Sequence, residues 1–163
     1  MAKLVSKVYG DALFEVAVES GRLDEIWEQT RAMQTALEEN PELFALMRHP
    51  KIVKEEKVKI IESIFTGEVC AELVGLLRMI VEKDHFAQIG EVLAYFDDQV
   101  KEYKSIGTAY VTTAMELSDA QKAAVVKRLL ETTKYVTFEM HYEVDSAIIG
   151  GMMIRIGDRV VDS

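Results

Sequence analysis

The fourteen residues GGMMIRIGDRVVDS, at positions 150–163, decide the fold of the end of the chain. Two short apolar runs, Met152–Ile156 and Arg159–Asp162, flank a Gly-Asp pair. This arrangement predicts a β-hairpin, because glycine readily adopts the positive φ angle that a tight turn needs. The residues expected to form structural turns here are Gly150, Gly151, Gly157 and Asp158.

Upstream of the hairpin, residues 136–144 alternate between apolar and polar side chains, a period of two that is typical of a strand. Another strand is expected over residues 108–115. Between them, Ser118 and Gln121 have the spacing of a capping box, which predicts a helix that runs to about Thr133. The order is therefore β-α-β-β-β, with a helix on one face of the sheet and a polar outer face.

The residues before about position 105 follow a helical period instead. Gly21 and Gly67 are expected to end helices, and Asn40 with Pro41 is expected to begin one. Six helices are predicted, the fifth over residues 68–83 and the sixth over residues 86–104. The predicted fold class is α+β, with a six-helix bundle at residues 1–105 and a small β-α-β-β-β domain at residues 106–163.

Composition narrows the classes of function. The chain has 163 residues, of which 49% are hydrophobic, so it can bury a core without disulfides. No run approaches the roughly 18 apolar residues of a membrane span, so no direct membrane insertion is expected. The single cysteine, Cys70, has apolar neighbours, which favours a buried thiol over a zinc or redox site.

The net charge of −9 argues against nucleic acid as a partner, because nucleic-acid binding needs a cationic surface. The acidic composition fits a protein partner better than nucleic acid. Most of the acidity lies early in the chain, where residues 1–105 carry 13 Lys and Arg against 20 Asp and Glu. A partner with basic residues would be steered toward that part.

The strongest candidate for an enzymatic site is His141, Glu143 and Asp145, which project to the same side of a predicted strand. They could act as metal ligands or as an acid and base, but a solvated strand face in an acidic protein is the simpler explanation. The sequence contains no phosphate-binding loop, dinucleotide fingerprint or nucleophile elbow. We therefore expect no cofactor, no metal and no catalytic residues.

Residues 69–81 are apolar nearly all round a predicted helix, and the first helix also has more apolar positions than one core stripe needs. A central helix wrapped by its five neighbours would explain the first pattern. Alternatively, the two helices form a hydrophobic groove that receives an amphipathic helix. The small residues Gly10, Ala12 and Gly75 would allow such a helix to approach closely.

Several motifs are arranged in the order of one known family. They are Tyr9-Gly10-Asp11-Ala12-Leu13-Phe14-Glu15-Val16-Ala17, Gly21-Arg22-Leu23-Asp24, Asn40-Pro41-Glu42-Leu43, His49-Pro50-Lys51-Ile52, Leu117-Ser118-Asp119-Ala120-Gln121, and Val144-Asp145-Ser146-Ala147-Ile148-Ile149 with the hairpin that follows. Together they resemble the δ subunit of F-type ATP synthase, the family of the oligomycin sensitivity conferring protein, over the whole chain. Two departures are Gly10, where the family usually has alanine, and the end at residue 163, where the family usually continues into one more helix. The small domain is therefore expected to lack its last helix.

The resemblance implies a non-catalytic stator subunit that joins the catalytic head to the peripheral stalk. In that family the helical domain holds the N-terminal helix of an α subunit in a groove between its first and fifth helices, and the second domain meets the stalk b subunits. The corresponding groove positions here are Tyr9, Ala12, Leu13, Val16, Leu73, Leu76, Leu77, Ile80 and Lys83. The resemblance also implies a monomer when isolated, and a peripheral place on the cytoplasmic face of the bacterial cell membrane.

Two other functions remain open from the residues alone. A free-standing helical adaptor could use the same groove for another peptide, and co-purification with α, β and b subunits would distinguish it from a stator. A small metal-dependent enzyme built on His141, Glu143 and Asp145 is the more distant alternative, which metal analysis would test.

Overall fold

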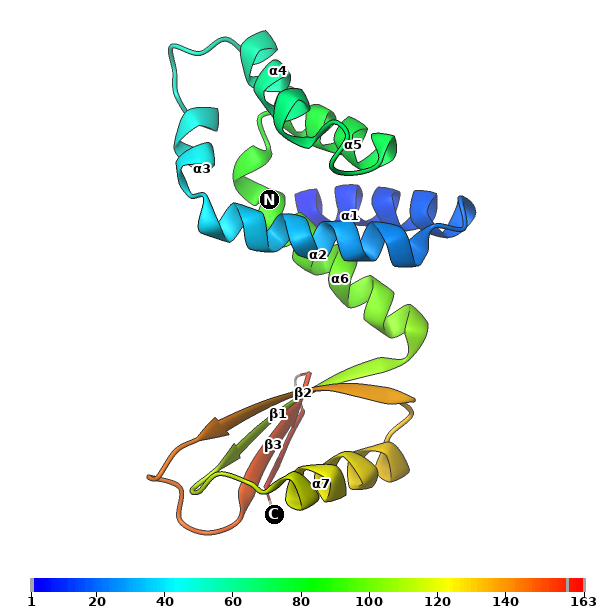
Figure 1. Cartoon of the computed structure of the whole chain (residues 1–163), viewed down its shortest axis with the longest axis vertical. Coiled ribbons are helices and arrows are strands. Elements are labelled where there is room, and N and C mark those ends of the chain that lie inside the picture. Colours follow the sequence, from blue (N-terminus) through cyan, green and yellow to red (C-terminus); the bar gives the residue numbers. More distant parts are fainter. Residues whose placement is uncertain (1, 158, 163) are drawn as a thin grey trace. The chain divides into compact units, whose positions relative to one another are not determined.

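The computed structural model describes residues 2–157 and 159–162 of the chain. The chain divides into two compact units, Met1–Val100 and Lys101–Ser163. The first is helical and the second contains a four-stranded sheet (Figure 1). Lys101, at the start of the second unit, forms an ion pair with Glu139 of the same unit.

Within its described residues, the helical unit contains six α-helices and one short 3-10 helix. They are α1 (Ala2–Glu19), α2 (Leu23–Glu39), α3 (Glu42–Met47), α4 (Lys54–Phe65), α5 (Ala71–Glu82), η1 (Phe86–Gln88) and α6 (Ile89–Lys104), whose last residues belong to the second unit. Gly21 and Gly67 have φ angles of +68° and +87° just after α1 and α4. Both glycines therefore end helices in the left-handed conformation, as the sequence predicts.

Two helix boundaries differ from the prediction. Helix α5 begins at Ala71, three residues later than expected, and the Cys70 N–H just before it donates to Gln29 Oε1 at 2.8 Å. Asn40 does not cap the start of α3 with its side chain. Its Nδ2 donates to the carbonyl of Ala36 at 2.7 Å and so satisfies the end of α2 instead.

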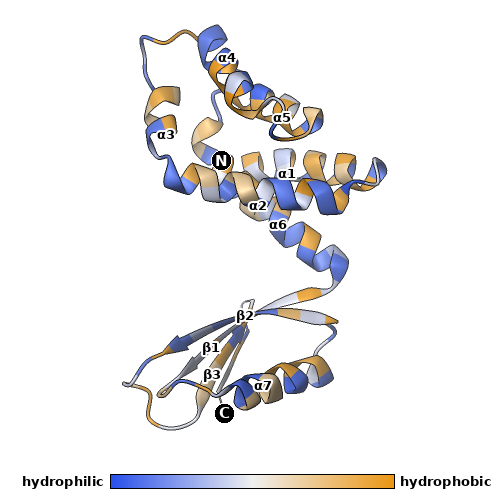
Figure 2. Ribbon diagram, viewed as in Figure 1, coloured by the Kyte–Doolittle hydropathy of each residue, from blue (hydrophilic) through white to orange (hydrophobic). Residues whose placement is uncertain are grey.

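The core of the helical unit draws residues from every one of its helices. Hydrophobic and hydrophilic residues mix along the helices in Figure 2, and the fully buried large side chains include Ile26, Ile61, Leu73, Leu77, Ile80, Ile89, Leu93 and Phe96. Burial of each such side chain contributes about 1.5–3 kcal/mol. Helix α5 is central to this core, since it contacts α1, α4 and η1.

Helices α1 and α6 meet closely at Gly10. A Cβ atom at this position would collide with the ring of Tyr95, so only glycine leaves room for it. The Tyr95 hydroxyl donates to Asp11 Oδ1 at 2.9 Å, and Gln99 Nε2 donates to the same oxygen at 2.7 Å. Lys7 donates a further hydrogen bond to the Asp11 carboxylate. All three hydrogen bonds lower the pKa of the Asp11 carboxyl, and the bond from Lys7 has the largest effect.

The sheet unit has the strand order β2-β1-β3-β4. Its elements after α6 are β1 (Ile106–Thr113), α7 (Asp119–Thr132), β2 (Thr137–Val144), β3 (Met152–Ile156) and β4 (Arg159–Asp162). Strand β1 pairs in parallel with β2, through the crossover helix α7, and antiparallel with β3. The predicted capping box is confirmed, because the Gln121 N–H donates to Ser118 Oγ at 3.1 Å and the Ser118 N–H donates to Gln121 Oε1 at 2.8 Å.

Helix α7 covers one face of this sheet. Its Val125 and Leu129 are buried with Ala109 and Val111 of β1. The apolar face of β2 is only partly covered, because Tyr142 and Val144 are exposed. Around the hairpin, Gly150, Gly151 and Gly157 have φ angles of +69°, +66° and +58°, as expected for turns, while Asp158 lies outside the described residues.

The crowding at Gly10 leads to a matched test. Gly10→Ala should destabilise the protein by about 1–3 kcal/mol, because the added methyl group displaces the Tyr95 ring. Gly75→Ala, in the middle of α5, meets no atom within 4 Å and should instead stabilise by about 0.5–1 kcal/mol. Urea unfolding of both variants measures the two effects. A stabilising Gly10→Ala would contradict the close approach of the two helices.

Candidate functional site

The structure places most of the predicted groove residues in the core. Leu13, Leu73, Leu77 and Ile80 are at most 2% exposed, and Tyr9 and Leu76 are 8% and 9% exposed. These six side chains therefore support a surface from beneath and do not form it. The predicted set follows the family resemblance, by motif and helix order, and a motif does not show which apolar positions the neighbouring helices cover. Only Ala12, Val16 and Lys83 of the predicted set are exposed.

A different set of apolar side chains does reach the surface of α1. Leu4, Val8 and Val16 are 63%, 55% and 38% exposed, and Ala12 lies between the last two. Because these positions are four residues apart, they form one continuous stripe along the helix. The predicted set includes Ala12 and Val16 of this stripe but not Leu4 and Val8. An exposed apolar stripe of this length is typical of a site that another protein covers.

One side of α5 faces α1. Glu72 of α5 is paired with Arg22, which lies just after the end of α1, and this pairing lowers the pKa of the Glu72 carboxyl. Met79 and Lys83 lie seven and eleven residues after Glu72, about two and three turns further on, so they share its side of the helix. Met79 is 50% exposed. The side of α5 that carries Glu72 thus offers an apolar side chain and a cation.

A second contact fixes the other end of this helix pair. The Tyr9 hydroxyl lies 3.2 Å from Nδ1 of His85, which follows α5, and their rings are in edge contact at 5.8 Å. The two contacts hold α1 and α5 antiparallel. We call the exposed residues along this pair the α1–α5 surface, which consists of Leu4, Val8, Ala12, Val16, Met79 and Lys83.

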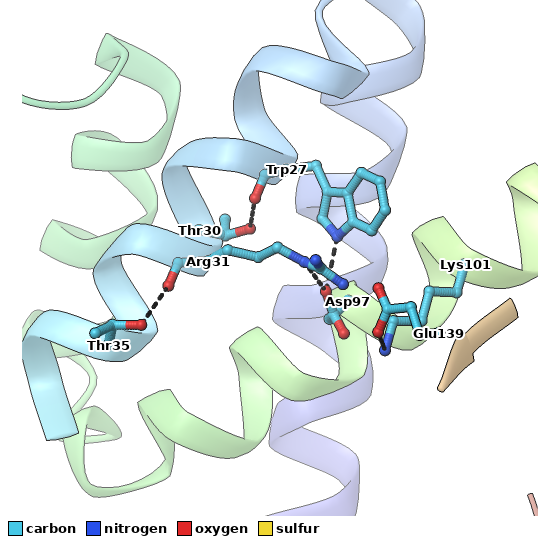
Figure 3. Close-up of polar contacts among 7 residues, drawn as sticks. All are labelled: Trp27, Thr30, Arg31, Thr35, Asp97, Lys101 and Glu139. Carbon is cyan, nitrogen blue, oxygen red and sulfur yellow. Dashed lines mark hydrogen bonds and ion pairs between the residues drawn. The ribbon is translucent and has the colours of Figure 1, made fainter. Parts of the chain in front are cut away.

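A polar clamp joins α2 to α6 in the same unit (Figure 3). Trp27 Nε1 and Arg31 Nε both donate to Asp97 Oδ1, at 2.7 and 3.0 Å. The Arg31 guanidinium also lies 4.3 Å from the centre of the Trp27 ring, within reach of a cation–π interaction. Asp97 is mostly shielded from solvent, which strengthens these charged bonds. The clamp therefore fixes the position of α2 relative to α6.

The sheet unit does not bring His141, Glu143 and Asp145 together as a site. The His141 ring stacks on Tyr110, with centroids 4.7 Å apart, and the Arg155 guanidinium lies 4.2 Å from the Tyr110 ring centre. Asp145 Oδ1 accepts a bond from the Ala147 N–H at 3.0 Å and shapes the turn after β2. Among the residues that the structure describes, no group of three or more His, Cys, Asp and Glu side chains is placed to hold a metal ion.

Comparison with known proteins identifies the family. The model of the ATP synthase delta (OSCP) subunit family matches residues 5–163. The chain belongs to this family. It is 51% identical to ATP synthase subunit delta of Lachnoclostridium phytofermentans, over all of this chain and 90% of that protein. It is 32% identical to the same subunit of Alkaliphilus oremlandii, over 99% of this chain and 89% of that one.

A solved structure agrees with the fold. A chain of the Toxoplasma gondii mitochondrial ATP synthase hexamer superposes with a TM-score of 0.77, at 17% identity, over 96% of this chain and 88% of that chain. As a delta (OSCP) subunit, the protein is a non-catalytic stator component of F-type ATP synthase, neither a free-standing adaptor nor an enzyme. It binds the α-subunit N-terminus and the peripheral stalk, as a peripheral part of a membrane-bound complex. In the part of the chain that the structure describes, no helix has the length and hydrophobicity to span a bilayer.

Stability measurements can test which apolar positions are buried and which are exposed. Leu77→Ala should cost about 2–5 kcal/mol of stability, because it opens a cavity at a fully buried position. Val8→Ala should change stability by about 0.5 kcal/mol or less, because Val8 is exposed. Denaturant unfolding of the two variants would check this. Equal, small losses would show that Leu77 is at the surface after all.

Proposed function

We propose that the α1–α5 surface is the part of this delta subunit that receives the N-terminal helix of an α subunit. The observation that carries the proposal is the exposed stripe of Leu4, Val8 and Val16 beside the α5 side that holds Met79. An amphipathic helix laid on this surface would bury these side chains, which is the usual mode of helix recognition. The predicted residues Ala12, Val16 and Lys83 would contact it directly, and the six buried ones would support it from below.

The proposal extends to how the two units divide the work. The helices α1–α6 act as one bundle, at residues 1–105, on the catalytic head at the cytoplasmic face of the membrane. The sheet unit, at residues 106–163, faces the b subunits of the stalk. Its Tyr110, His141 and Arg155 side chains, stacked across three strands, offer a rigid aromatic and cationic surface for that contact.

A stator has to resist torque without taking part in the chemistry. Rotation within the head is coupled to synthesis only if the outer ring of the head is held against the membrane sector. The contacts of this subunit with the head and with the stalk must therefore both dissociate slowly. Related interfaces differ mainly in dissociation rate, which depends on buried apolar anchors. The stripe on α1 and Met79 supply such anchors for the head, and the packed core beneath them keeps their positions fixed.

A synthetic peptide of the α-subunit N-terminus tests the proposed surface. Val8→Asp should weaken its binding at least about tenfold, because the charge would be desolvated under the bound helix. Val53→Asp is the matched control: Val53 is also exposed, at 60%, and it occupies the N-cap of α4, where aspartate is favourable. Binding by titration calorimetry and folding by circular dichroism are measured for both variants.

Unchanged affinity in a folded Val8→Asp protein would overturn the assignment of α1. Equal weakening by Val53→Asp would show that the peptide responds to charge alone and not to the α1–α5 surface.

A further inference from the structure

The helical unit has a second hollowed surface on other residues. One hollow, of about 510 Å³, lies between α2 and the end of α4, and its apolar lining includes Ala32, Met33, Ala36, Ile64 and Phe65. A second hollow, of about 420 Å³, adds residues of α3 and is lined by Ala36, Leu37, Leu43, Leu46, Ile64 and Phe65 among others. The two share Ala36, Ile64 and Phe65, so they form one continuous trough, which we call the α2–α4 groove.

The floor of this groove suits a helix. Ile64 is 44% exposed although it is large and apolar, so it offers a contact that the unit itself does not use. Ala32 and Ala36 are exposed and small, so the backbone of a second helix can approach α2 closely. Along α2 the lining runs from Glu25 to Asn40, which at 1.5 Å per residue is about 22 Å, or four helical turns.

The rim of the groove carries charge of one sign. Four carboxylates lie among its lining residues, namely Glu25, Glu28, Glu42 and Glu68. Among the described residues that line the two hollows there is no Lys, Arg or His. Of these four carboxylates, that of Glu25 forms an ion pair with Arg22, with 3.7 Å between Glu25 Oε2 and Arg22 Nη1. An occupant with cations on both sides of an apolar stripe would therefore match the rim as well as the floor.

We propose that the α2–α4 groove is a second docking site, and that it takes a basic amphipathic helix of about four turns from a partner protein. The apolar stripe of that helix lies on Ala36, Ile64 and Phe65, and its Lys or Arg side chains pair with the glutamates of the rim. The site shares no residue with the α1–α5 surface. This proposal is therefore tested independently of the head contact proposed above.

The test uses the full chain and a designed peptide of about 16 residues, with a leucine stripe and Lys or Arg on both flanks. A matched peptide carries Glu in place of each Lys and Arg. We expect saturable 1:1 binding of the basic peptide, weakened by salt, with amide chemical-shift changes on α2, α3 and the end of α4. The acidic peptide should not bind.

Variants of this chain test the apolar floor and the acidic rim of the groove separately. Ile64→Gln should weaken the basic peptide about tenfold, and so should the double variant Glu28→Lys with Glu68→Lys. Glu116→Lys with Glu131→Lys is the matched control, because it changes the net charge equally at exposed positions of the sheet unit. That control should leave the affinity unchanged.

Five results would overturn the proposal. Four of them are no binding, equal binding of the acidic peptide, shift changes centred on α1 and α5, and equal weakening by the sheet-unit control. Concentration-dependent dimerisation that is lost in Ile64→Gln would assign the groove to a second copy of this chain, and would overturn it as well.

Discussion

The burial of α5 is the constraint on which the rest of the helical unit depends. Leu73, Leu77 and Ile80 are fully covered, so helices must enclose α5 on the sides where these residues point. Helices α1 and α4 and the short η1 do so. The polar contacts from Arg22 to Glu72 and from Tyr9 to His85 lie at the edges of this packing, where they fix the direction of α1. The hydrophobic effect supplies most of the stability, and the polar contacts select one arrangement.

This packing also accounts for the surface that we propose for the α-subunit helix. Because the core side of α1 is already occupied by Tyr9 and Leu13, the apolar residues left over on this helix form a stripe on its outer side. Such a stripe is held in place before any partner arrives, so little conformational entropy has to be lost on binding. A prearranged apolar surface over a rigid core suits a subunit that has to hold against torque.

Local features of the fold could be predicted from the sequence, and features set by distant contacts could not. The capping box at Ser118 and the glycine turn at Gly157 depend on a few neighbouring residues, and both are present. The start of α5 coincides instead with a hydrogen bond from Cys70 to Gln29, forty-one positions away, which no local pattern reveals. Side-chain competition misled the prediction at Asn40, whose amide is used by the preceding helix.

The candidate site was harder to predict than the fold, for a related reason. Motifs and periodicity located α1 and α5 correctly as helices rich in apolar residues, but several stripes of each helix are apolar. Which stripe remains exposed depends on where the neighbouring helices lie, and that is a tertiary property. Leu4 and Val8 could have been found only by asking which apolar positions of α1 are in excess of one core stripe.

The position of α6 shows how the glycine at position 10 is matched elsewhere in the chain. Glycine at position 10 removes helix propensity from α1, yet it makes room for the Tyr95 ring, whose hydroxyl binds Asp11. Asp97, two residues after Tyr95, is held by Trp27 and Arg31 of α2. Neighbouring turns of α6 are thus bound to two different helices through carboxylates.

The hydrogen bonds to the Asp11 carboxylate depend on pH. Its hydrogen bonds, the first from Lys7, lower the pKa of the Asp11 carboxyl, so the folded state favours the ionised form. The stabilisation is therefore complete above the ordinary pKa of an aspartate, and it is lost as the pH falls through the lowered value. At the neutral pH of a working ATP synthase, the carboxylate stays ionised and α6 stays fixed to α1.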